Sequence, residues 1–210
     1  MRHLLNTYVQ ADPATKLGEL GEMSLTGLII DTGIHDAIAR KLNESGKLSK
    51  SAIAEVIINN VRKTIIRERL MDPRFYSEMS KLLEDLIAQG RASEAEYEQF
   101  LRKAEALVRR LAARQPNEGV PAELHGKREA TAIYNNLPGI LAHEGRTGCD
   151  QERAALALEI DQVMRESAPA GWKGDQAREA QVLNALFPLL NRDSAATLAL
   201  FELVKNQSGY

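Results

Sequence analysis

The strongest constraint on the fold comes from two neighbouring segments whose apolar residues repeat with the period of an α-helix. Their apolar positions are Phe75, Met79, Leu82, Leu83, Leu86 and Ile87 in the first segment, and Tyr97, Phe100, Leu101, Ala104, Leu107, Val108 and Leu111 in the second. These spacings place each set on one continuous face of a helix. The short link between the segments predicts that the two helices lie antiparallel.

Residues suited to helix ends stand at the borders of both segments. Asp72 can cap the first helix, and Pro73 occupies the first helical position, where its missing N–H costs nothing. Gly90 is suited to end that helix in the left-handed conformation. Ser93 and Glu96 have the spacing of a capping box, which predicts the start of the second helix.

A third helix is predicted immediately before this pair, over residues 51–70. Its apolar residues are Ile53, Val56, Ile57, Ile58, Val61, Thr64, Ile65 and Ile66. This stripe is too wide for a surface helix, so we expect the helix to pack on two sides as the central member of a bundle. Runs of isoleucine and valine also suit strands. The helical spacing of the polar residues and the absence of a hairpin turn favour the helix.

Proline and glycine divide the rest of the chain into regions. We expect the end of an upstream helix and linker at 1–23, a helical bundle at 24–115, a linker at 116–149 and a three-helix unit at 150–210. A short helix over 128–136 is expected inside the linker. The last three helices are expected at 150–166, 175–187 and 193–206, with Asp150, Asp175 and Asp193 as their caps.

Together these patterns predict an all-α fold: a multi-helix bundle with a long antiparallel helix pair and no sheet. Whether residues 24–115 and 150–210 pack as one domain stays open. The abrupt helical start indicates a piece cut from a longer chain.

Composition excludes several classes of protein. A net charge of −2 argues against a strongly basic nucleic-acid binder, although it leaves room for a local basic face. A single cysteine, Cys149, rules out an internal disulfide and a cysteine-rich metal site. No apolar run has the roughly 20 residues that span a bilayer, and no signal peptide is recognisable. We therefore expect a cytoplasmic protein with no membrane contact.

The sequence contains no recognisable set of catalytic residues. It has no G-x-x-x-x-G-K-[ST] phosphate-binding loop and no H-E-x-x-H zinc motif. The histidines are scattered, and His143 lies near Cys149 only in sequence, so neither a metal site nor a nucleophile–base pair is expected. We predict no catalytic residue, no metal ligand and no cofactor in this chain.

Positive charge is concentrated in two places. The first cluster contains Arg62, Lys63, Arg67, Arg69 and Arg74, and the second contains Arg109, Arg110 and Arg114. Such faces can hold phosphates or an acidic partner. The simpler interpretation is a solvated helix face.

The only tryptophan lies in a loop. Trp172 stands beside Lys173, in the stretch Ala168–Gly174. It can be an exposed anchor for a partner, with Lys173 beside it. The more common alternative is that it pins the loop onto the protein's own core.

Four segments together resemble a known family. They are GIHDAIARKLN at 33–43, KSAIAEVIINNVRKTIIRERLMDPRFYSEMSKLLEDLI at 50–87, APAGWKGDQAREAQVLNALFPLL at 168–190 and FELVKNQSGY at 201–210. In this order they resemble the C-terminal helical region of the R (restriction, motor) subunit of type I restriction–modification enzymes. The resemblance covers about residues 6–210, and it aligns Tyr210 with the family's chain end.

The resemblance implies a large parent enzyme, an ATP-dependent DNA translocase and endonuclease. In that family the nuclease and motor domains, which use ATP and Mg²⁺, lie upstream, and none of their motifs matches a position here. The resemblance implies that this region docks the R subunit on the methyltransferase core, made of M and S subunits. Contact with duplex DNA is a further expectation.

Two alternatives to the assembly role stay open. The first is direct DNA binding, with Arg62, Lys63, Arg67 and Arg74 on phosphates. The second is a structural brace for the motor domains, with no partner outside the subunit.

Overall fold

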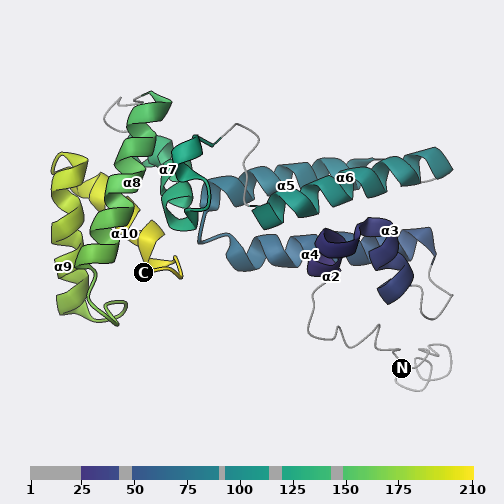
Figure 1. Ribbon diagram of the computed structural model, residues 1–210, viewed down its shortest axis with the longest axis horizontal. Helices are drawn as coiled ribbons and strands as arrows, with labels where there is room; N and C mark the ends of the chain where they lie inside the picture. The colour runs from purple at the N-terminus through teal and green to yellow at the C-terminus, as the bar shows by residue number, and fades with distance from the viewer. Residues whose placement is uncertain (1–24, 43–48, 90–92, 114–119, 143–148) are drawn as a thin grey trace, which may run out of the picture.

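The computed structural model describes residues 25–42, 49–89, 93–113, 120–142 and 149–210. Helices and connecting turns make up this part of the chain, and no strand occurs in it, which confirms the all-α prediction (Figure 1). The predicted helix at the N-terminus, the role of Gly90 and the position of Arg114 fall outside the described residues.

The first helical unit contains the long antiparallel pair that the sequence predicts. Its elements are α2 (Leu25–Thr32), α3 (Ile34–Ala37), the π-helical turn η1 (Ile38–Leu42), α4 (Lys50–Glu68), α5 (Pro73–Ala88) and α6 (Glu94–Ala113). Figure 1 shows α4, α5 and α6 running along one another, with α2 and α3 against them. Gly33 separates α2 from α3 with a φ of 84°, a backbone conformation that favours glycine.

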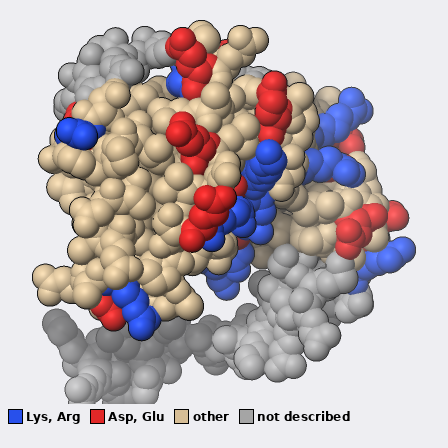
Figure 2. All heavy atoms as spheres, turned by 60° about the vertical axis from the view of Figure 1, so that its left-hand side comes forward, with Lys and Arg blue, Asp and Glu red and all other residues tan. Residues whose placement is uncertain are grey.

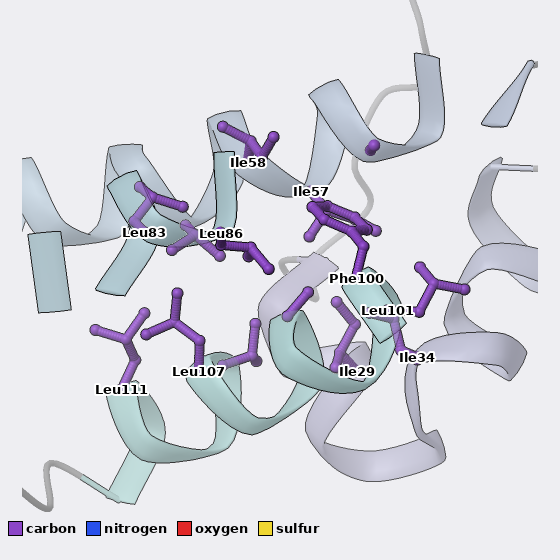
Figure 3. Packing of buried hydrophobic residues seen from close by; sticks show 14 of the residues in the cluster. Ile29, Ile34, Ile57, Ile58, Leu83, Leu86, Phe100, Leu101, Leu107 and Leu111 are labelled. Carbon is purple, nitrogen blue, oxygen red and sulfur yellow. The ribbon is translucent and has the colours of Figure 1, made fainter. Parts of the chain in front are cut away.

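The core of this unit is aliphatic and aromatic. Side chains from the long helices and from α2 and α3 converge between them (Figure 3). Ile57, Met79 and Phe100 have no exposed surface. Because α4 contacts α2, α5 and α6, it packs on more than one side, as expected for a central helix.

The second unit begins before residue 150. Its elements are η2 (Ala122–Leu124), α7 (Arg128–Ile140), α8 (Asp150–Ser167), α9 (Gln176–Leu186), η4 (Phe187–Leu190) and α10 (Ser194–Lys205). They enclose a separate hydrophobic core. In Figure 1, α8 and α9 run across the direction of the long helices of the first unit.

The prediction of a linker at 116–149 is wrong for the described residues 120–142. Helix α7 is longer than the predicted 128–136 and supplies the centre of the second core, where Ala130, Ile133, Leu137 and Leu141 are buried. Proline and glycine in this stretch suggested a linker, but Pro138 lies inside α7 near its end. Burial against α8 outweighs the local cost of that proline.

Side-chain caps start most of the helices, as predicted. The Asp72 carboxylate accepts a hydrogen bond from the Phe75 amide (3.2 Å). Ser93 and Glu96 form the reciprocal capping box, with N···O distances of 2.9 and 3.2 Å. Asp175 and Asp193 cap α9 and α10.

Asp150 is the exception among the predicted caps. The residue at the N-cap of α8 is Cys149, and Asp150 is the first helical residue. The Glu152 side chain accepts a hydrogen bond from the Cys149 amide (3.0 Å). The cap therefore lies one residue earlier than predicted, and Asp150 acts through its charge in the first turn.

A polar junction connects the two units. Asp72 is buried, and its carboxylate also accepts hydrogen bonds from the side-chain amides of Asn135 and Asn136 of α7, both at 2.7 Å. The Asp72 side chain thus starts α5 in the first unit and binds α7 in the second.

Candidate functional site

The C-terminal end of α4 carries a group of exposed side chains that we call the α4 patch. Its members are Arg62, Lys63, Ile66, Arg67, Arg69 and Leu70. Arg69 follows the helix but keeps helical backbone angles (φ −52°, ψ −37°), so the helical path continues beyond Glu68. At about 100° per residue, Ile66 and Leu70 lie between two rows of cations. The rows are Arg62 with Arg69 on one side, and Lys63 with Arg67 on the other.

Ile66 and Leu70, the apolar pair of the patch, are exposed to solvent. Ile66 is 68% exposed and Leu70 is 64% exposed. The prediction that Ile66 belongs to the buried stripe of α4 is therefore wrong. Ile65 is buried, but the next residue points about 100° further around the helix, away from α2, α5 and α6.

The cations of the patch are mostly available to a partner. Arg67 pairs with Glu68 (3.0 Å), whose other carboxylate oxygen accepts a hydrogen bond from the Tyr76 hydroxyl (2.6 Å). Within the described residues, Arg62, Lys63 and Arg69 form no ion pair. Arg67 lies in the last turn of α4 and Arg69 directly follows it, where the negative end of the helix dipole favours cations.

A shallow groove adjoins the patch. Its lining comes from α2, α4 and α6, and it includes Arg67 of the patch and Arg128 of α7. Glu68 also lines the groove, so charges of both signs lie between the patch and the second unit.

Arg74 belongs to the junction between the units. Its backbone amide donates to the Asn136 side-chain oxygen (3.2 Å), and its guanidinium donates to the Asn135 carbonyl (3.3 Å). The structure therefore assigns Arg74 a structural contact that its place in the basic cluster did not suggest.

The second predicted basic cluster is used in ion pairs. Arg109 binds Glu105 one helical turn earlier (2.7 Å), and this bond lowers the pKa of the Glu105 carboxyl. Arg110 reaches Glu78 of α5 (3.4 Å) and is half-buried. These contacts tie α6 together and to α5, so the cluster offers less free charge than α4.

Trp172 is buried, which corrects the interpretation as an exposed anchor. Only 2% of its surface is accessible, and its ring lies 5.7 Å from that of Phe201 in α10. It therefore pins the loop between α8 and α9 onto the second core.

Lys173 is fixed beside this loop. Its amine donates to the backbone carbonyl of Gln207, and burial lowers its pKa. The bond connects the loop to the segment that follows α10, so this lysine is structurally engaged as well.

A cluster that the sequence analysis missed holds the last residue, Tyr210, on α8. Its hydroxyl donates to the Asp161 carboxylate (2.6 Å), and Arg165 binds the other oxygen of that carboxylate (3.0 Å). Arg165 also pairs with Glu129 of α7 (3.3 Å). Burial and the bond to Asp161 raise the pKa of the Tyr210 phenol. Polar residues so far apart in the sequence gave no periodic signal.

The outer side of α9, η4 and α10 presents a second kind of surface. Figure 2 shows a broad uncharged area on this side of the molecule, beside a region where acids and bases alternate. Among the exposed residues of α9, η4 and α10 are Gln181, Asn184, Pro188 and Leu198, and Leu198 is 55% exposed. A single exposed leucine among small and polar neighbours makes this face a useful control surface.

The described residues hold no group of three or more His, Cys, Asp or Glu side chains that could bind a metal ion. In the same part of the chain, every helix is too short or too polar to cross a membrane. The α4 patch is thus the best candidate for a functional site, and the chemistry it offers is binding.

Comparison with protein-family models, curated proteins and solved structures gave no match for this chain.

Proposed function

We propose that this chain is an assembly module, the C-terminal helical region of a type I restriction R subunit, which docks the motor subunit on the methyltransferase core. The observation that carries the proposal is the α4 patch, where two exposed aliphatic side chains lie between cations. The ordered resemblance of four segments to that family supplies the identity of the partner.

The mixture of exposed apolar and positive side chains favours a protein partner. Exposed apolar groups gain free energy when another protein covers them, at about 25 cal/mol per Å². Cations around them then set the orientation and the rate of association.

Direct DNA binding is the second candidate. It is favoured by one observation, that Arg62, Lys63 and Arg69 form no ion pair among the described residues. Each phosphate contact would add roughly one to the slope of log affinity against log salt.

Under this proposal the chain has no catalytic activity of its own. ATP hydrolysis and DNA cleavage belong to upstream domains of the parent, where ATP and Mg²⁺ bind. Steady ATP hydrolysis or duplex cleavage by the purified chain would contradict this part of the proposal.

Retention of the purified chain on immobilised methyltransferase core from the same operon tests the proposal. We expect retention without DNA that persists when salt is raised from about 0.1 to 0.3 M, where surface charges are largely screened. Retention only with duplex DNA, lost in the same salt range, would instead support phosphate binding. Absence of retention in both cases would favour a brace inside the R subunit.

A further inference from the structure

We propose that the α4 patch binds an acidic amphipathic helix of the partner protein, which inserts apolar side chains over Ile66 and Leu70. The inference deepens the proposed function, and it rests on that function only for the identity of the partner. Two features of the patch support it, the exposed apolar pair and the cations on both sides of that pair.

Highly exposed large hydrophobic side chains are rare in the described part of this chain. Large hydrophobic side chains are highly exposed at three described positions, Ile66, Leu70 and Leu198, and two of these form the apolar pair. Ile66 lies in the last turn of α4 and Leu70 in the turn that follows it, and Arg69 between them keeps helical angles, so the pair forms a short ridge at the end of the helix. Ridges of this spacing fit the groove between side chains on a second helix.

The cations on both sides of the pair identify the charge of that helix. A cation row on each side of the ridge would face both flanks of a helix docked along it. Acidic residues on both flanks would pair with these rows, while basic residues would be repelled. Lys63 and Arg67, one turn apart, also repel each other in the free chain, and acidic partner residues would relieve this repulsion.

DNA fits this surface less well than an acidic helix. Phosphates would satisfy the cations, but contacts to the DNA backbone are made by charged and polar groups. They would leave Ile66 and Leu70 without apolar partners. An anionic membrane also fits poorly, because surface binding needs a long apolar helix face and the ridge has two side chains.

Fluorescence anisotropy with the whole chain and a designed peptide tests the inference. The probe is a labelled 18-residue helix with leucines at i, i+3, i+4 and i+7 and glutamates on both flanks. A second peptide with lysines in place of the glutamates controls for charge. We expect the acidic peptide to bind and the basic peptide to fail.

Two double variants test the apolar contact and the electrostatic contact separately. Ile66→Ser with Leu70→Ser should weaken peptide binding by about tenfold or more at both low and high salt, because the apolar contact is lost. Lys63→Gln with Arg69→Gln should weaken binding at about 0.05 M salt, and the loss should shrink towards 0.5 M. Leu198→Ser, an exposed leucine on the uncharged face, is the matched control and should bind as the parent chain does.

Several results would overturn the inference. They are failure of the acidic peptide to bind, an equal loss in the Leu198→Ser control, and binding that the Ile66→Ser/Leu70→Ser variant leaves unchanged. Tight binding of duplex DNA or of anionic lipid vesicles would also overturn it, if the Ile66→Ser/Leu70→Ser variant binds them as tightly as the parent chain does.

The same variants applied to the methyltransferase core distinguish the two proposals. If the core binds the parent chain and Ile66→Ser/Leu70→Ser equally well, the inference fails and the assembly role stands. If the acidic peptide binds through the ridge and the core does not bind, the inference stands and the partner is a different acidic protein.

Discussion

The two helical units bury their cores in different ways. In the first unit, long helices close a core of large side chains along continuous stripes, and Figure 3 shows this packing at the middle of α4, α5 and α6. In the second unit, residues from a loop and from the segment after the last helix pack with the helices around the core. Trp172 comes from the loop after α8, and Tyr210 comes from the segment after α10.

This difference separates local from long-range determinants of stability. The first unit depends on side chains whose period is visible in each helix. The second depends on contacts between distant residues, such as the hydrogen bond from Tyr210 to Asp161. We therefore expect single changes in the loop and tail of the second unit to destabilise it strongly. In the first unit we expect large losses of stability for changes in the apolar stripes of its helices.

The largest effect is expected for Trp172→Ala. Removing a buried tryptophan should lower the free energy of unfolding of the second unit by about 3–5 kcal/mol. Urea denaturation followed by circular dichroism measures this loss. Trp172→Phe is the matched control; it keeps most of the ring and removes the indole N–H, which has no hydrogen-bond partner among the described residues. An alanine variant as stable as the phenylalanine variant would show that the loop does not close the core.

The next effect tests whether the units unfold separately. Ile57→Ala in the first core should cost about 2–5 kcal/mol. Fluorescence of Trp172, the only tryptophan, reports the second unit. We expect the circular dichroism transition to move to lower urea while the fluorescence transition stays in place. If the circular dichroism and fluorescence transitions shift together, the two units unfold as one cooperative unit, and the distinction between them fails.

Asp72→Ala should destabilise the junction that connects the units. It removes a helix cap, which costs about 1 kcal/mol, and leaves the buried Asn135 amide without its 2.7 Å partner, which costs about 1–3 kcal/mol more. Ser93→Ala removes the capping box of α6 alone and should cost only the first amount. If urea unfolding shows the same loss of unfolding free energy for Asp72→Ala and Ser93→Ala, the contacts of Asp72 with α7 contribute little.

Tyr210→Phe should cost about 1.5–3 kcal/mol near neutral pH, because a hydrogen bond to a charged carboxylate is lost. The tyrosine pKa is higher in the folded chain than its usual value near 10. Its contribution is therefore fully present below about pH 10, and it falls as the pH rises further, because only the unfolded chain then loses the proton. Urea unfolding at pH 7 and pH 10.5 should show the difference between parent and variant shrinking. If the stability difference between the parent chain and the variant did not change with pH, the Tyr210 hydroxyl would not form a stabilising hydrogen bond with Asp161.

The smallest effect is expected at the α4 patch. Ile66→Ser with Leu70→Ser should change the free energy of unfolding by less than about 0.5 kcal/mol per site, because both side chains are exposed. A thermal melt checks this. A loss above about 2 kcal/mol would show that the pair packs against the protein itself.

Much of the first unit could be predicted from the sequence. The stripe of α6 matches its buried residues, and that of α5 does so except that Leu82 and Ile87 are partly buried and the buried Tyr76 was missed. Asp72, Ser93 and Glu96 cap the helices as expected. These signals are local, since each depends on residues within one or two helical turns.

Contacts that depend on the tertiary arrangement could be predicted less well. Ile66 looked buried because the stripe of α4 is wide, and only the positions of α2, α5 and α6 decide which side is covered. A short helix over 128–136 was expected, but Pro138 and Gly139 led us to assign its surroundings to a linker, whereas α7 continues to Ile140 and packs in the second core. The site is similar: the cations of α4 were identified, but the exposed ridge between them required the structure.

Hydrogen exchange of the chain, alone and bound to the methyltransferase core, tests the central claim most directly. The assembly role through the α4 patch predicts slower exchange over residues 62–71 in the complex, with the uncharged residues 180–191 unchanged. Slower exchange over 180–191 with none over 62–71 would contradict the claim, because the partner would then bind the second unit.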